Sequence, residues 1–214
     1  TIHEGSYGGG DWQWTANEYD KFDNVISHWD TRATANLRGP NGGNVTVAAN
    51  ETEYNPDWVD ANNKVVTPAG TLVTRTTGPI RSMQDSDGDT VWARPVIATT
   101  YDNGEQAKIN PLSGQPYRLP TKVVTSTITQ GDGVWDVHEV LSTVWTGYDG
   151  TTEDGTPDGG MTGWALGQPT STTLDMDNSG TINPGDITRE TVYDAEGRVV
   201  QQRQPSAAGS STDP

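Results

Sequence analysis

The chain has 214 residues, of which 29 are Asp or Glu and 13 are Lys or Arg, so that its formal charge is −16, and it contains no cysteine. The acidic balance excludes a nucleic-acid or anionic-membrane partner, because binding to phosphate needs a basic patch. The absence of cysteine excludes disulfide frameworks, zinc–thiolate clusters and thiol catalysis. No stretch approaches the roughly 18 consecutive apolar residues of a membrane span, so we expect no membrane insertion.

The apolar content is low but suits a β protein. Leu, Ile, Val and Phe total only 34 residues, and such a share with a high net charge is typical of disordered chains. Eight Trp and seven Tyr nevertheless need burial, and the aliphatic residues are mostly Val interleaved with Thr, as in half-buried strands. We therefore predict a folded, all-β chain with a thin core and little or no helix.

Period-2 alternation predicts strands along the chain, and helical periodicity is not evident. The expected strands are 45–48, 72–77, 91–100, 170–174 and 189–193, together with a hairpin of strands 122–129 and 134–145 around the turn 130–133. Turns or loops are expected at 39–43, 85–89, 150–160 and 206–214, where Gly, Pro, Asn, Asp and Ser cluster. The last of these is expected to be a flexible linker or chain end.

A repeated Tyr-Asp element runs through the sequence. It occurs at Tyr19-Asp20, Tyr101-Asp102, Tyr148-Asp149 and Tyr193-Asp194, with Tyr54-Asn55 as a degenerate fifth copy. From Tyr54 onward the tyrosines are 47, 47 and 45 residues apart. A second element, Leu119-Pro120-Thr121 and Gln168-Pro169-Thr170, keeps step with the last two tyrosines.

Two of the copies continue in the same way. Tyr-Asp is followed by two variable residues, then Gly197 and Arg198 or, in the first copy, Asp23 and Asn24, and then two β-branched residues. The Asp caps a turn, the Gly supplies a positive φ, and the apolar pair starts the return strand. Asp23 substitutes for the Gly at modest cost, since Asp tolerates the left-handed region.

This pattern resembles the YD repeat of the Rhs family, most closely from Tyr193 to Pro205, and the resemblance extends over residues 15–35 and 95–205. It implies a spiralling ribbon of consecutive antiparallel β-hairpins that closes into a hollow shell. Residues 1–205 would form one such segment, with residues 175–186 inserted as a loop. The thin core fits a wall that has one face toward solvent and one toward a cavity.

The resemblance also implies the function. Shells of this kind enclose a C-terminal toxin in polymorphic toxins, and related repeats serve adhesion in teneurin-like proteins. We expect a structural segment of a secreted or surface-exposed bacterial protein, whose partners are other segments of the same polypeptide and an enclosed toxin domain. The alternative is a surface adhesion or carbohydrate-binding module built on the same repeats.

The segment 175–186 has the pattern of a calcium loop. Oxygen-bearing side chains occupy positions 1, 3, 5, 9 and 12, Gly stands at 6 and Ile at 8, and the carbonyl at position 7 would complete the set. The expected ligands are Asp175, Asp177, Ser179, Thr181, Asn183 and Asp186. Asp instead of Glu at position 12 resembles dockerin-type loops, but strands rather than long helices are expected to flank it. The alternative is a solvated acidic hairpin tip.

The surroundings of the loop are acidic. Between Val123 and Thr188 there is no Lys or Arg but there are ten acidic residues, which would raise the local cation concentration. A weaker cation candidate, residues 85–89, is better explained as an Asp-Gly hairpin turn.

Trp12 and Trp14 alternate on one face of a strand and could form a sugar-stacking platform, but such a pair more often fills a groove between hairpins or docks an adjoining domain. Catalysis is not expected. The three histidines, His3, His28 and His138, lie in no nucleophile-elbow or metal-ligand spacing. A polysaccharide-degrading enzyme would need paired acids in a cleft, whereas the acids here fall mostly in turns.

Overall fold

The computed structural model describes residues 2–4, 13–30, 50–84, 88, 90–105, 108–110, 112–131, 134–150 and 162–204. Within these ranges the chain consists mostly of antiparallel strands, which confirms the all-β prediction. Helix is limited there to one 3-10 turn, η1 (Asp102–Gly104), and one short helix, α2 (Thr162–Leu166). The chain divides into two compact units, and β9, β10 and β11 contribute residues to both.

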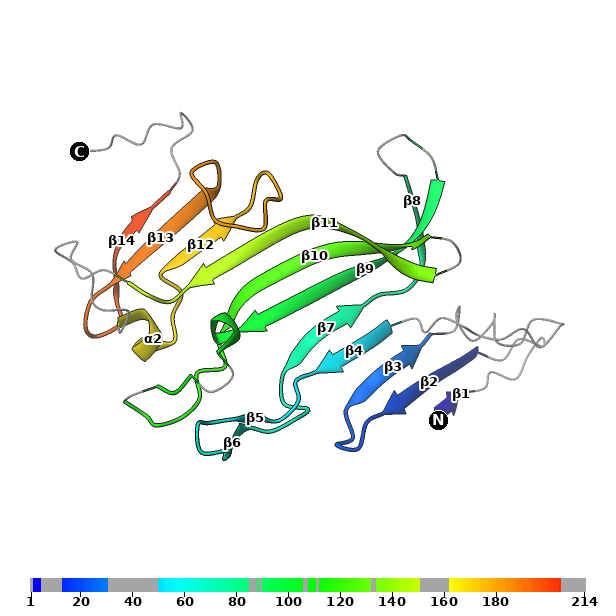
Figure 1. Cartoon of the computed structure of the whole chain (residues 1–214), viewed down its shortest axis with the longest axis horizontal. Helices are drawn as coiled ribbons and strands as arrows, with labels where there is room; N and C mark the ends of the chain where they lie inside the picture. Colours follow the sequence, from blue (N-terminus) through cyan, green and yellow to red (C-terminus); the bar gives the residue numbers. More distant parts are fainter. Residues whose placement is uncertain are drawn as a thin grey trace. The chain divides into compact units, whose positions relative to one another are not determined.

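The first unit comprises residues 1–56, 68–98 and 125–139. Its strands follow the order β1–β2–β3–β4–β7–β9, and β8 also pairs with β9 (Figure 1). Their bounds are β1 (Ile2–Glu4), β2 (Gln13–Tyr19), β3 (Val25–Trp29), β4 (Asn50–Tyr54), β7 (Val73–Thr77), β8 (Arg81–Gln84) and β9 (Thr90–Tyr101). Most neighbours along the chain are neighbours in the sheet, as short connections favour.

The second unit comprises residues 57–67, 99–124 and 140–214. Its strands follow the order β9–β10–β11–β12–β13–β14, and β5 and β6 form a separate two-stranded sheet. The bounds are β5 (Trp58–Val59), β6 (Val65–Thr67), β10 (Pro120–Gly131), β11 (Val134–Gly147), β12 (Ser171–Leu174), β13 (Ile187–Tyr193) and β14 (Val199–Arg203).

Most of the expected strands coincide with observed ones. The expected hairpin corresponds to β10 and β11, which are adjacent in the sheet, and β7, β9, β12 and β13 overlap the strands expected from alternation. The strand expected at 45–48 and most of the expected turns, including 206–214, lie outside the described residues. β1, β4, β5, β6 and β8 were not predicted: β4 has no aliphatic residue, and the other four are only two to four residues long.

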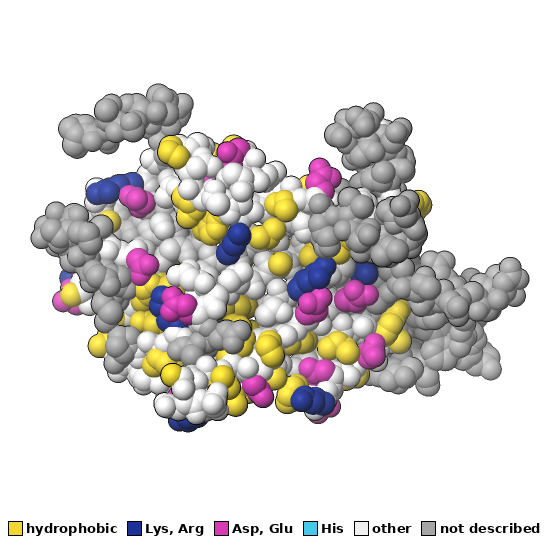
Figure 2. Space-filling model, in the orientation of Figure 1, with side chains coloured by type: hydrophobic (Ala, Val, Ile, Leu, Met, Phe, Trp, Pro, Cys, Tyr) yellow, Lys and Arg dark blue, Asp and Glu magenta, His cyan; other side chains and the backbone are white. Residues whose placement is uncertain are grey.

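The core is thin and rich in threonine. In the first unit the buried apolar side chains are Ala93, Val96 and Ile128, and in the second they are Trp58, Tyr148, Trp164, Val192 and Tyr193. Among the described residues seven threonines are buried as well: Thr67, Thr77, Thr121, Thr127, Thr143, Thr170 and Thr173. On the face shown in Figure 2, acidic and basic side chains are scattered among apolar ones. Such strands bury little apolar area, so hydrogen bonds at the turns have more weight in fixing the fold.

Candidate functional site

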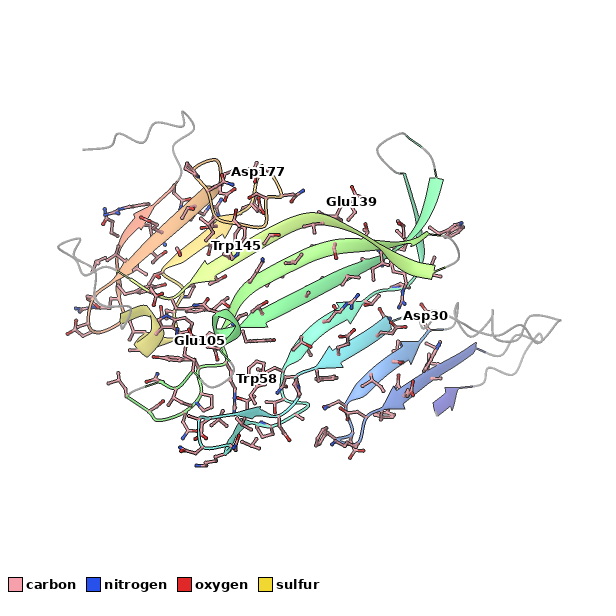
Figure 3. All side chains as sticks on the ribbon, viewed as in Figure 1. Asp30, Trp58, Glu105, Glu139, Trp145 and Asp177 are labelled. Atoms are coloured by element: carbon pink, nitrogen blue, oxygen red, sulfur yellow. The ribbon has the colours of Figure 1, made fainter. Side chains whose placement is uncertain are left out.

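The loop of residues 175–186 connects β12 to β13, whose facing ends are paired as Leu174 with Ile187. It is therefore an insertion at the tip of a β-hairpin, flanked by strands as the sequence indicated. Figure 3 labels Asp177 on this loop. The flanking ladder is closed by a hydrogen bond of 2.9 Å between the hydroxyls of Thr173 and Thr188.

Three carboxylates converge in the loop. Asp175, Asp177 and Asp186 each place one oxygen within 4.8 Å of the others. Asp175 is 5% exposed, Asp186 is half-buried and Asp177 is exposed. Like charges at such separations repel one another, and the three carboxylates could together hold a metal ion.

Asp175 anchors the loop to the sheet. Its backbone N–H donates to the carbonyl oxygen of Thr143 at 3.0 Å. Its two carboxylate oxygens accept the backbone N–H groups of Ser179 at 3.2 Å and Gly180 at 2.9 Å. The turn between them contains two residues with positive φ, Asn178 at 54° and Gly180 at 74°, which Asn and Gly adopt most readily.

Asp186 closes the loop from its other end. Its carboxylate accepts the N–H of Met176 at 3.1 Å and that of Asn183 at 2.8 Å. The first and last acids of the motif are thereby held by backbone amides. The loop is preorganised around its own carboxylates by these contacts.

The remaining expected ligands lie in the same cluster. Ser179 donates its hydroxyl to the carbonyl oxygen of Thr181 at 2.9 Å. Asn183 donates its Nδ2 to Ser179 Oγ at 3.0 Å and to both oxygens of Asp177, at 3.2 and 3.3 Å, while its Oδ1 accepts the N–H of Gly185. In this arrangement an amide nitrogen, not an oxygen, of Asn183 faces the cluster, and a half-turn of the amide would present Oδ1.

Hydrogen bonds within the loop favour the ionised form of Asp177. The hydroxyl and backbone N–H of Ser179 are the main causes that hold the pKa of Asp177 below its ordinary value. The lone pairs that remain on three carboxylates, a hydroxyl and a carbonyl make up an oxygen-only donor set. That chemistry fits a hard divalent cation, for which all six expected residues could serve.

A second set of contacts recurs at Asp20, Asp60 and Asp194, each of which opens a turn. The N–H of the Asp donates to the carbonyl four residues on at 2.9 Å in all three turns. Its carboxylate accepts the N–H groups two and four residues on, at 2.8 to 3.1 Å. The residue three positions on has a positive φ, 63° at Asp23, 60° at Asn63 and 82° at Gly197. In each turn a bulge pairs the residue before the Asp with the residue five after it.

The Asp60 turn was missed in the sequence. A tyrosine precedes the Asp in the other two turns, whereas Val59 precedes Asp60. The signal was present, because Asp60-Ala61 followed by Asn63-Lys64-Val65-Val66 parallels Asp194-Ala195 followed by Gly197-Arg198-Val199-Val200. Arg198 itself pairs with Asp194 at 2.6 Å and with Glu196 at 2.9 Å, but it is 73% exposed, so these ion pairs contribute little stability.

Asn55 and Asp102 hold two longer loops by the same set of hydrogen bonds. The backbone N–H of each donates to the carbonyl of a leucine 17 residues on, Leu72 at 2.9 Å or Leu119 at 2.8 Å. The side-chain oxygen of Asn55 accepts the N–H groups of Leu72 and the residue before it, and the two oxygens of Asp102 accept the corresponding pair. Burial raises the pKa of Asp102, and the two N–H groups only partly offset that effect.

Three tyrosines join neighbouring strands. The hydroxyl of Tyr54 donates to the carbonyl of Val25 at 3.4 Å, that of Tyr148 to Pro120 at 3.1 Å, and that of Tyr193 to Pro169 at 3.1 Å. In each case a tyrosine at the end of one strand, or one residue past it, reaches the start of its sheet neighbour or the residues just before it: β4 to β3, β11 to β10, and β13 to β12. These three contacts are called tyrosine clasps below.

The other members of the repeat are placed differently. Tyr19 is 48% exposed, and its hydroxyl oxygen accepts Asn17 Nδ2. Tyr101 packs against Trp58 with ring centroids 6.3 Å apart, and burial raises its pKa. Asp149 is exposed and opens no turn of the Asp194 kind within the described residues; its carbonyl instead accepts the hydroxyl of Thr170.

Several expected sites cannot be placed. Trp12 and, of residues 85–89, all but Gly88 lie outside the described residues, and only the backbone of Trp14 is described, in β2.

In the part of the chain that is described, no helix has both the length and the apolar character needed to cross a membrane. No protein-family model, curated protein or solved structure matches this chain.

Proposed function

We propose that the chain is a structural segment of a secreted Rhs-type YD-repeat shell, a wall of β-hairpins that encloses and delivers a toxin. The observation that supports this best is the recurrence of one turn at Asp20, Asp60 and Asp194 with the same hydrogen bonds, bulge and positive φ. Two of the four Tyr-Asp copies thus share one local structure, which occurs once more at Val59-Asp60. A wall assembled from successive hairpins needs such a standard turn at each return of the chain.

The tyrosine clasps fit the same role. Each clasp joins the end of one strand to the beginning of its neighbour and replaces apolar packing by a directed hydrogen bond. The scarcity of buried aliphatic side chains in both units suits a sheet that faces an aqueous space on each side. Such a sheet would gain stability from neighbouring hairpins of the same polypeptide, which we regard as its partners.

The loop 175–186 would serve this wall as a structural Ca²⁺ site. The ligands would be the carboxylates of Asp175, Asp177 and Asp186 with oxygens of Ser179, Thr181 and Asn183. A bound cation would neutralise three converging charges and stabilise the folded hairpin tip by mass action. In an extracellular setting, micromolar to millimolar free calcium would then stabilise the folded conformation of the loop.

Electron microscopy of the full natural polypeptide that contains this chain tests the shell. We expect a closed hollow particle with density inside it, into whose wall the strands of each unit can be fitted. An open rod or a compact solid domain would overturn the shell and favour the adhesion alternative, for which glycan binding is then the assay.

Isothermal calorimetry with calcium chloride tests the metal site separately on the 214-residue chain. We expect a saturable binding heat at one site per chain. If no heat and no change in melting temperature accompany millimolar calcium, the loop is an acidic hairpin tip without a metal, and the shell proposal is unaffected.

A further inference from the structure

Among the described residues, β14 pairs with one strand and is exposed along its whole length. It pairs with β13 and is the last strand in the order of the described sheet. All five of its residues are exposed, including Val199 at 51% and Val200 at 46%. A strand edge of this kind presents alternate backbone N–H and C=O groups that can pair with another strand.

The chain contains a template for what covers such an edge. β3 follows the Asp20 turn as β14 follows the Asp194 turn, so that Val25 corresponds to Val199. The outer edge of β3 is covered by antiparallel β4, through the pairs Ser27 with Glu51 and His28 with Asn50. The clasp from Tyr54 to the carbonyl of Val25 then fastens the end of β4 to the beginning of β3.

A third strand after the same turn is covered in another way. β6 follows the Asp60 turn, and Val66 in it corresponds to Val200. Arg118 donates from its guanidinium to the carbonyl of Val66 at 2.9 Å and to the hydroxyl of Thr67 at 3.1 Å. Among the described residues, therefore, the edge of β3 is met by a strand and that of β6 by an arginine, whereas β14 is met by neither.

We infer that the outer edge of β14 is the docking site for one further antiparallel strand, ending in a tyrosine whose hydroxyl donates to the carbonyl of Val199. The occupant is a strand of the same polypeptide, so the inference rests on the proposed function and names the contact by which the wall is extended. The tyrosine is specified because all three clasps in the described chain reach a carbonyl at the beginning of the preceding strand or, for Pro169, two residues before it. A second copy of β14 would not supply this contact, since its sequence Val-Val-Gln-Gln-Arg has no tyrosine.

The test extends the 214-residue chain after Pro214 with a second copy of residues 48–55, Ala-Ala-Asn-Glu-Thr-Glu-Tyr-Asn, which includes the strand that covers β3. Tethering raises the effective concentration of the added strand to about the millimolar range. Two matched extensions carry Phe in place of the tyrosine or Pro in place of the central Thr. Amide hydrogen exchange of residues 199–203 is measured in all three and in the unextended chain, with sedimentation to record the oligomeric state.

We expect the tyrosine extension to slow exchange in β14 at least tenfold in a monomer. The Phe extension should lose about two- to tenfold of that protection, the value of one hydrogen bond. The Pro extension should lose most of it, because proline cannot donate in a strand ladder.

Three results would overturn the inference. If the tyrosine extension leaves exchange unchanged, β14 does not accept a strand. If the Phe extension protects equally well, the clasp is not part of the contact. If the unextended chain dimerises with its β14 protected, the occupant is a second copy. A hollow particle in the microscope together with any of these would leave the proposed shell standing and remove only the contact proposed here.

Discussion

The hydroxyl of Tyr193 lies 3.1 Å from the carbonyl oxygen of Pro169 and joins the end of β13 to the residues just before β12. Tyr148 makes the same bond to Pro120 at the same distance, one hairpin earlier in the sheet. The two tyrosines are 8% and 4% exposed. A buried hydroxyl that reaches a carbonyl at a strand start fixes both the register and the closure of the hairpin.

Replacing either tyrosine by Phe should destabilise the chain by about 0.5–1.5 kcal/mol, because one buried hydrogen bond is lost while the ring is kept. Urea unfolding of Y148F and Y193F measures the change. Y19F is the matched control: Tyr19 is 48% exposed and makes no clasp, so its removal should have almost no effect. Equal losses in all three variants would show that the clasps contribute nothing particular.

Gly197 has a φ of 82°, and a β-branched residue strongly resists that conformation. We expect Gly197→Val to cost about 1–2 kcal/mol or more. Space is not the reason, since a Cβ at this position would meet only Leu166 at ordinary contact distance, 3.4 Å.

The equivalent turns supply the controls for Gly197. Gly197→Asn should be milder than Val, because Asn63 occupies the same position at 60°. Asp23→Gly should be neutral or stabilising by up to about 1 kcal/mol, since it relieves a positive φ. Thermal melts of the three variants decide the matter, and an unchanged melting point for Gly197→Val would mean that the turn is not built as described.

Because Asn55 and Asp102 hold their loops through the same backbone contacts, the substitutions Asn55→Asp and Asp102→Asn can be compared directly. Asn55 is 2% exposed, and its Nδ2 donates to the carbonyls of Pro56 at 2.7 Å and Pro68 at 2.9 Å. Asn55→Asp removes both donors and buries a charge, so we expect a loss of about 2–5 kcal/mol at neutral pH. Asp102→Asn removes a buried charge and keeps one acceptor, so a change under about 1 kcal/mol is expected. Similar losses in both variants, measured by chemical unfolding, would show that neither the Nδ2 contacts of Asn55 nor a charge buried there affects stability as described.

Acid should weaken the repeated turns. The backbone N–H of Arg198 lowers the pKa of Asp194, and that of Lys64 lowers the pKa of Asp60, both from the ordinary 3.8. A carboxylate with a lowered folded-state pKa stabilises the fold above its ordinary pKa, and this contribution is lost as the pH falls through the lower value. Melting temperatures between about pH 2 and 5 should therefore fall steeply at the acid end, and less steeply in Asp194→Asn.

The buried Asp102 has the opposite effect on the pH dependence of stability. Its folded-state pKa is raised, so its charge weakens the fold as the pH rises from 3.8 through the raised value. Asp102→Asn should flatten the pH dependence in that range and leave the steep acid fall unchanged. If the variant instead removed the acid fall, the turns would not be its cause.

Calcium should raise the melting temperature through the loop 175–186, since a ligand that binds only the folded state stabilises it by about 2.7 kcal/mol at one hundred times its Kd. Asp177→Asn should remove most of the rise with little effect on the metal-free chain, because the side chain is exposed. Glu139→Gln, an exposed change of the same charge on β11, should retain it. Magnesium should be less effective, as it demands stricter octahedral geometry. A rise that persists in Asp177→Asn would place the calcium elsewhere.

The local features could be predicted from the sequence because their bonds span few residues. The return turns at Asp20 and Asp194 close within four residues, and the acids of the candidate metal loop are gathered by contacts within eleven positions of the chain. Alternation of Val and Thr likewise indicated most of the longer strands. In each case the types of side chain and their spacing are sufficient to predict the local structure.

Other features were decided only by the tertiary structure. The clasps join residues 24 to 29 positions apart, and Arg118 covers the edge of β6 from 52 positions away. No spacing rule relates such partners, because the path between them depends on where each hairpin docks in the sheet. The Asp60 turn is local and its sequence parallels the Asp194 turn, but it lacks the tyrosine that marked the others, and its hydrogen bonds, positive φ and bulge identified it as a copy. The turns of this protein are thus set by hydrogen bonds between residues close in the sequence. The clasps and the contacts of Arg118 depend instead on which strands lie side by side in the sheet, and only the tertiary structure decides that.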